Sequence, residues 1–134
     1  MRIVIDTNVF ISGIFWEGNF CSQIINLWKN GKYTLITSEE ILEEFRKVLK
    51  TFKIQMEAPL IEEWEEIIRY NAEIVIPKER LKIIIEDPDD NKFFEAAITG
   101  QAGYIISQNK HLLKIKEYKG IHVLTPKEFL EKVK

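Results

Sequence analysis

Cysteine and histidine are scarce in this sequence of 134 residues. Cys21 is the only cysteine, and two histidines are present. A single cysteine cannot form an internal disulfide, and it excludes zinc sites built from several thiolates. The histidines and Cys21 are scattered at spacings that do not suit a zinc site. Cys21 lies within a helical pattern, so we expect it to be a small core residue.

Long apolar stretches are also missing. No segment approaches the roughly 20 apolar residues that a membrane-spanning helix needs, and the carboxylate of Asp6 comes too early for a signal peptide. We therefore expect a cytoplasmic protein that does not interact with a membrane. The net charge of −2 argues against a non-specific nucleic-acid coat, which would be basic overall.

Short apolar runs alternate with helical patterns, and no repeat or flexible linker divides the chain. The runs predicted as strands are residues 3–5, 33–37, 74–76, 104–106 and 121–124. The predicted helices are residues 19–29, a helix capped by Ser38, residues 60–70, a helix from the 86–90 turn to residue 99, residues 111–115 and a helix opened by Pro126. Residues 83–85 are apolar, and they fit either a strand or a helix. The pattern predicts one α/β domain, residues 1–134, with a parallel sheet flanked by helices.

Ligands of parallel sheets collect beyond the carboxyl ends of the strands, and Asp6 directly follows the first predicted strand. Alone, Asp6 could equally serve a turn or cap a helix. In the helix after Ser38, Glu44 falls at the edge of the apolar stripe, whereas Glu40 and Glu43 face solvent. Glu44 could also be a boundary residue with its carboxylate in water.

Asp90 lies on the inward side of the next helix start, where it is either a cap or a ligand. We expect the carboxyl groups of Asp6, Glu44 and Asp90 to converge on one point. Their mutual repulsion should raise the pKa of at least one of them in the absence of metal. Oxygen ligands of this kind suit Mg²⁺ or Mn²⁺, and metals held by carboxylates commonly serve phosphodiester hydrolysis.

Four segments resemble, in order, the motifs of the PIN-domain family: residues 3–8, 37–45, 87–97 and 105–113. The resemblance implies that Asp6, Glu44 and Asp90 are the metal ligands. The family normally has a fourth aspartate where this chain has Asn109, and a further common acid is His111 here. Asn109 retains a carbonyl oxygen but removes one negative charge, so metal should bind less tightly.

The resemblance also implies a sheet of about five strands with helices on both faces. It implies a metal-dependent ribonuclease that uses Mg²⁺ or Mn²⁺ to cleave single-stranded RNA, with Asp6, Glu44, Asp90 and Asn109 as its catalytic residues. Many small PIN proteins are toxins that pair with an antitoxin protein and form homodimers, and we expect the same here. The residues expected to support the site or contact RNA are Asn8, Ser38, Asp87, Lys92 and Lys110. Asp87 or Asp89 could compensate for the charge that Asn109 lacks.

Two other functions compete with this interpretation. Because Asn109 replaces an acid, the domain could instead bind RNA or a protein without cleavage. A phosphatase of the haloacid-dehalogenase type also begins with a strand ending in aspartate. Such enzymes usually need a second aspartate two residues later, where this chain has Asn8, so this alternative is disfavoured.

Overall fold

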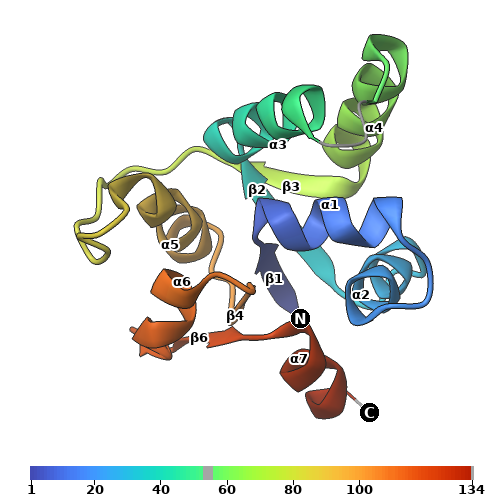
Figure 1. Ribbon diagram of the computed structural model, residues 1–134. Helices are drawn as coiled ribbons and strands as arrows, with labels where there is room; N and C mark the ends of the chain where they lie inside the picture. Colours follow the sequence, from blue (N-terminus) through green and yellow to red (C-terminus); the bar gives the residue numbers. More distant parts are fainter. Residues whose placement is uncertain (53–55, 134) are drawn as a thin grey trace.

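The computed structural model describes residues 1–52 and 56–133. Its centre is a sheet with the strand order β3-β2-β1-β4-β6-β5 (Figure 1). The strands are β1 (Arg2–Ile5), β2 (Thr34–Ser38), β3 (Ala72–Val75), β4 (Tyr104–Ile106), β5 (Glu117–Tyr118) and β6 (Ile121–Leu124). Every neighbouring pair is parallel except β5 and β6. The parallel sheet predicted from the sequence is therefore confirmed.

The short strand β5 was not predicted, and it adds a sixth, antiparallel strand to the sheet. Lys119 and Gly120 join it to β6, and both residues have positive φ angles of 49° and 84°. Positive φ at both central positions is typical of the tight turns that connect antiparallel hairpins. Glycine adopts such angles without steric cost.

Helices cover both faces of the sheet (Figure 1). They are α1 (Thr7–Phe15), α2 (Phe20–Lys29), α3 (Glu39–Thr51), α4 (Ala58–Asn71), α5 (Asn91–Thr99), α6 (Lys110–Ile115) and α7 (Pro126–Lys132), and the 3-10 turn η1 (Pro88–Asp90) precedes α5. The sheet has a hydrophobic core on each face, and successive side chains of β1 point to opposite faces. Ile3 and Ile5 pack on the side of α1 and α2, whereas Val4 packs on the side of α5. Cys21 is buried in α2, as predicted.

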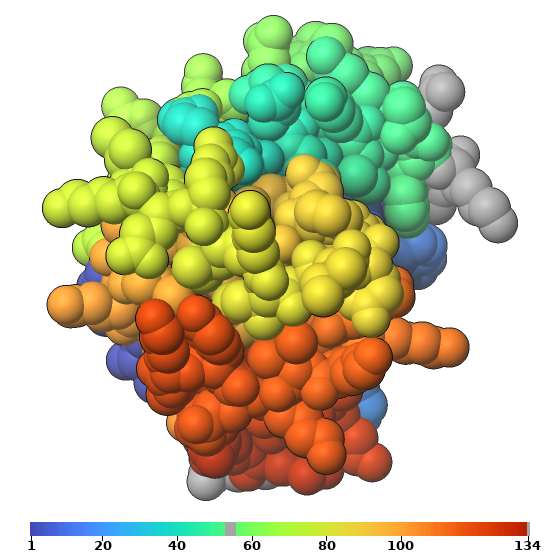
Figure 2. All heavy atoms as spheres, turned by 90° about the vertical axis from the view of Figure 1, so that its left-hand side faces the viewer, coloured from blue at the N-terminus to red at the C-terminus, as the bar shows by residue number. Residues whose placement is uncertain are grey.

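A segment without helix or strand, residues 76–87, crosses from β3 to η1, and we call it the strap. Residues 83–85, which fitted either element type, belong to it. Ile84 is buried, whereas Ile76 and Ile85 are exposed. Figure 2 looks onto the strap, coloured yellow-green to yellow, between the start of α3 and the region of α6.

Within residues 1–52 and 56–133, no helix is both long and apolar enough to cross a membrane.

Candidate functional site

Asp6 stands at the carboxyl end of β1, next to the carboxyl end of the neighbouring strand β4. Its backbone N–H donates to the carbonyl of Ile106 at 2.9 Å, and only 4% of the residue is exposed. The hydroxyl of Ser107 donates to Asp6 Oδ2 at 2.7 Å. Burial raises the pKa of Asp6, and the charge of Glu44 raises it further, against the opposing hydrogen bond from Ser107. The sequence therefore places a buried acid where parallel sheets bind ligands.

Asp90 lies where η1 passes into α5, and it is buried. Its Oδ2 accepts a hydrogen bond of 3.0 Å from the side-chain amide of Asn109. Burial, followed by the negative charges of Asp87, Asp6 and Glu44, raises the pKa of Asp90 to about 6. The expected rise in pKa is present, but burial, and not repulsion among the acids, is its largest cause.

Asn109 holds the start of α6 and faces Asp90 at the same time. Its side-chain Oδ1 accepts from the backbone N–H of His111 at 2.8 Å, and the backbone N–H of Asn109 donates to Ser107 Oγ at 2.9 Å. Since a backbone N–H can only donate, the oxygen must face His111 and the NH2 group must face Asp90. In this arrangement Asn109 offers Asp90 a hydrogen-bond donor, and its carbonyl oxygen is used as a helix cap.

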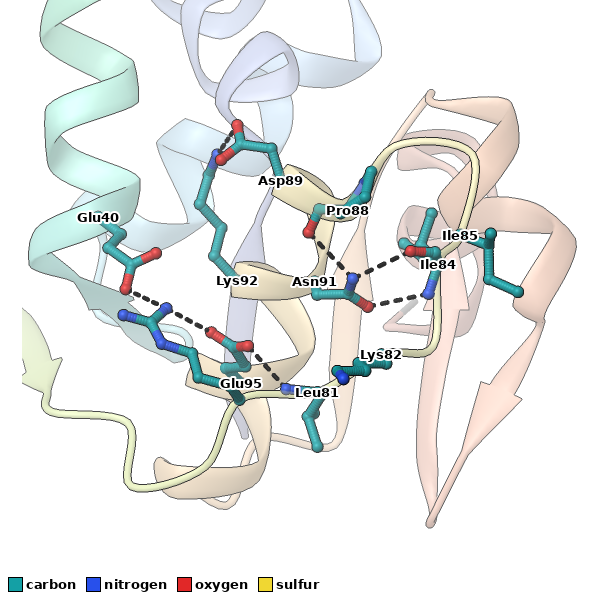
Figure 3. Close-up of a pocket in the computed structure, with 11 residues that line it drawn as sticks. Glu40, Leu81, Lys82, Ile84, Ile85, Pro88, Asp89, Asn91, Lys92 and Glu95 are labelled. Carbon is teal, nitrogen blue, oxygen red and sulfur yellow. Dashed lines mark hydrogen bonds and ion pairs between the residues drawn. The ribbon is translucent and has the colours of Figure 1, made fainter.

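Glu44 is held by two donors, one on each carboxylate oxygen. Thr7 Oγ1 donates to Oε2, and Lys92 Nζ donates to Oε1 at 2.8 Å. Lys92 Nζ also donates to Asp89 Oδ2 at 2.7 Å (Figure 3). Burial works to lower the pKa of Lys92, but the hydrogen bonds to Asp89 and Glu44 outweigh it and raise that pKa. We expected Lys92 to contact RNA, yet its side chain is 4% exposed and its ammonium group points at carboxylates.

The donor chemistry of Asp6, Glu44 and Asp90 fits a hard divalent cation, since all three offer carboxylate oxygens. Their spacing is looser than expected. Within the described ranges, no three acidic, histidine or cysteine side chains are grouped closely enough to hold a metal ion. The convergence on one point that we expected is therefore wrong for this arrangement. The charge of Glu44 nevertheless contributes to the raised pKa values of Asp6 and Asp90, while Lys92 and neutral hydrogen-bond donors stabilise the carboxylates.

The remaining residues expected near the site lie at its margins. Ser38 is buried, and its hydroxyl accepts from the backbone N–H of Ile41 at 3.4 Å, which confirms the predicted cap of α3. Asn8 is exposed on the first turn of α1, and its backbone N–H lowers the pKa of Asp6. Asp87 and Lys110 are exposed, and the charge of Asp87 raises the pKa of Asp90.

Two residues of the site, Thr7 and Ser107, were not identified as functional from the sequence. Thr7 follows Asp6 in sequence, and Ser107 follows the last residue of β4. The hydroxyl of Thr7 donates to Glu44, and that of Ser107 donates to Asp6. Their position beyond strand ends was a usable signal. Serine and threonine are so common at such positions that the signal is weak without the partner residue.

The strap forms one wall of a pocket of about 630 Å³ beside the site (Figure 3). Two buried side chains of α5 hold the strap in place. Asn91 bonds the backbone of Ile83 and Ile84, and Glu95 accepts from the backbone N–H of Leu81 at 2.9 Å. Lys92 lines the pocket and also bonds Glu44, so the strap forms a wall next to the candidate site.

Residues 2–111 of this chain match the family model described as PIN domain. The chain belongs to the PIN-domain family. It is 30% identical to the uncharacterized protein MJ1680 of Methanocaldococcus jannaschii over 144 residues, which cover 98% of this chain and 90% of the relative. Its fold is similar to a chain in the crystal structure of VapBC2 from Rickettsia felis bound to a DNA fragment from their promoter. The TM-score is 0.61 at 16% identity, covering 92% of this chain and 97% of the other.

Proposed function

We propose that this PIN domain is a metal-dependent endoribonuclease that hydrolyses phosphodiester bonds of single-stranded RNA. The observation that carries the proposal is the acid cluster at the carboxyl ends of the central strands, where burial and neighbouring charges raise the pKa of Asp90 to about 6. Buried carboxylates that repel one another destabilise a fold unless a cation or donors offset them. Membership in the PIN-domain family supports a nuclease.

Asp6, Glu44 and Asp90 are the residues that would hold Mg²⁺ or Mn²⁺, with Asn109 beside them. The bound metal would activate a water molecule and stabilise negative charge on the phosphate. Ser107 orients Asp6 and Thr7 orients Glu44 through the hydrogen bonds described above. These hydroxyls restrict the rotation of the two carboxylates, which keeps the ligand oxygens directed into the site.

The supporting residues suit a nucleic-acid chain that passes over α6. Lys110 is exposed next to Asn109, so its ammonium is placed to pair with a backbone phosphate. Asp87 adds negative charge near Asp90. Asn8, exposed at the first turn of α1, is placed to contact a phosphate, and Ser38 contributes by fixing the start of the helix that carries Glu44.

We also propose that the domain is a toxin paired with an antitoxin protein, acting as a homodimer in the cytoplasm. The support is the similarity of its fold to a chain of the VapBC2 structure and the small size of the domain. Co-expression with the product of a neighbouring gene, followed by co-purification and size measurement, would test the pairing.

The direct test is incubation of the purified protein with labelled single-stranded RNA in Mn²⁺, in Mg²⁺ and in chelator. We expect cleavage with metal, none with chelator, and none for Asp6→Asn. The variant should be at least as thermally stable as the wild type without metal, because it removes a buried charge and keeps an oxygen that can accept from Ser107. Cleavage that persists in chelator would contradict the proposal, and a collapse of stability in Asp6→Asn would make Asp6 a structural residue.

A second function, RNA or protein binding without cleavage, is favoured by one observation. Asn109 directs its NH2 group at Asp90 and uses its oxygen elsewhere, so the fourth family ligand is not replaced by an equivalent oxygen here. If the protein binds RNA with the same affinity in metal and in chelator, and no cleavage product forms, the result would support this alternative.

A further inference from the structure

Lys92 is a cation buried within the acid cluster. Its side chain is 4% exposed, although lysine is rarely buried unless it is paired. The ammonium bonds Glu44 at 2.8 Å and Asp89 at 2.7 Å. It comes from the second residue of α5, whereas Glu44 lies on α3, so one lysine joins two helices across the site.

The charge of Lys92 acts on every acid that the proposed function assigns to the metal. It bonds Glu44 directly, and it works to lower the pKa values of Asp6 and Asp90. Lowering the pKa of a carboxyl group means that the charged form is stabilised. Lys92 therefore performs, in part, the electrostatic task that a bound divalent cation would perform in full.

We propose that the ammonium group of Lys92 is a built-in counter-cation of the acid cluster, and that a divalent metal must displace it from Glu44 in order to bind. This inference rests on the proposed function, since it concerns the same acids. Lys92 thereby stabilises the metal-free protein and weakens its affinity for metal.

Charge and geometry both favour that displacement. Oε1 and Oε2 of Glu44 are already engaged by Lys92 and Thr7. An ammonium group left within a few ångströms of a divalent ion would repel it strongly, since Coulomb energy grows with the product of the charges.

The structure also offers the ammonium group a place to go. Asp89 is 73% exposed, so Lys92 can release Glu44 and keep its bond to Asp89 at the surface. Asp89 and Lys92 both line an open pocket of about 210 Å³, together with residues of α3. Metal binding and the position of Lys92 are thus linked without a rearrangement of the backbone.

The test compares metal binding in the wild type with Lys92→Met, which keeps the length of the side chain and removes its charge. Thermal stability is measured in chelator and across a Mn²⁺ titration, without RNA. We expect Lys92→Met to melt at a lower temperature in chelator, and its half-saturating Mn²⁺ concentration to fall by roughly tenfold or more. Lys92→Arg, which keeps the charge, should remain close to the wild type in both measurements.

A matched control removes a lysine charge elsewhere. Lys114 pairs with Glu86 at 3.4 Å but is 75% exposed, so Lys114→Met should change neither the melting temperature in chelator nor the Mn²⁺ midpoint appreciably. If Lys92→Met is too unstable to purify, Lys92→Gln removes the charge while keeping a donor for Glu44. A Mn²⁺ midpoint that is unchanged or higher in a folded, uncharged variant would overturn the inference.

A second measurement uses the wild type alone. In protein labelled with ¹⁵N at lysine side chains, a buried ion-paired ammonium gives a resolved signal that is assigned with Lys92→Arg. Saturation with Mg²⁺ should shift this signal or remove it, because the ammonium leaves Glu44. A signal that stays unchanged while Mg²⁺ raises the melting temperature would overturn the inference and leave the metal site standing. If neither the wild type nor Lys92→Met responds to metal, the proposed function fails and the inference fails with it.

Discussion

Asn109 shows how a carboxamide changes a site in which the family normally has a carboxylate. The amide oxygen caps α6 through the N–H of His111, and the NH2 group bonds Asp90. A neutral donor beside a buried carboxylate stabilises its ionised form, and it adds no charge of its own. The metal-free site is therefore less repulsive than one with four acids, while its attraction for a cation is weaker.

Asn109→Asp should reverse this balance. The new carboxylate can still accept from His111, but its second oxygen would face Asp90, so the metal-free protein should lose thermal stability. The affinity for Mn²⁺ should rise by roughly tenfold, and Mn²⁺ should restore the lost stability by linkage. Metal-dependent melting of both proteins measures these effects.

The matched control is Asn109→Ala, which removes the cap and the donor without adding charge. Loss of a cap costs on the order of 1 kcal/mol, so this variant should also be less stable but should gain no metal affinity. Equal metal affinity in the wild type and Asn109→Asp would show that residue 109 does not face the metal.

The elements that the sequence predicted well are those with a clear periodicity. Buried parallel strands appear as short apolar runs, and α3 has one apolar stripe. Helix α1 was not predicted as a helix, because its residues Thr7–Phe15 are apolar on nearly all sides and show no stripe. Strand β5 has two residues, which is too short for any pattern.

The candidate site was predictable in part for the same reason. The rule about strand ends locates Asp6, and the helical geometry locates Asp90 on the buried side. The inward position of Lys92 could not be derived, since a lysine in an amphipathic pattern normally faces solvent. Its burial makes sense only with Glu44, which is distant in sequence and becomes a neighbour through the packing of α3 beside α5.

Of the two side chains of α5 that hold the strap, Asn91 makes more hydrogen bonds to its backbone than Glu95 does. Asn91 is buried, accepts from the N–H groups of Ile83 and Ile84 at 3.0 and 2.9 Å, and donates to the carbonyls of Ile84 and Pro88. Asn91→Ala would leave several backbone groups without partners, at a cost of about 1–3 kcal/mol each where no water replaces the bond. We expect a lower melting temperature and faster amide hydrogen exchange in the strap than in the strands of the sheet.

Asn71→Ala serves as the control for that prediction. The side chain of Asn71 is exposed and donates a single bond to the carbonyl of Ile67, so its loss should change the unfolding free energy by a few tenths of a kcal/mol. If hydrogen exchange in the strap were unchanged in Asn91→Ala, contacts other than those of Asn91 would hold the strap.

At the scale of the whole molecule, the acids with shifted pKa values fall into two sets with opposite effects on the pH dependence of stability. Surface carboxylates such as Glu39 and Glu65 have lowered pKa values because arginines hydrogen-bond them. They add stability that is lost as the pH falls through their folded pKa values. The buried acids Asp6 and Asp90 have raised pKa values, with burial as the largest cause. They therefore make the metal-free protein less stable as the pH rises.

The pH dependence of Asp90 can be isolated with Asp90→Asn. The carboxyl pKa is about 6 in the folded protein against a reference value of 3.8, so the folded state binds more protons between these values and stability falls as the pH rises through that window. Urea unfolding in chelator should show the smallest difference between the two proteins near pH 4. At pH 8 Asp90→Asn should be the more stable, by up to about 3 kcal/mol. Adding Mg²⁺ at pH 8 should stabilise the wild type more than the variant, since the variant lacks one charged ligand. A difference that stays constant from pH 4 to pH 8 would mean that Asp90 does not titrate in this range, and that its carboxylate is not held among like charges.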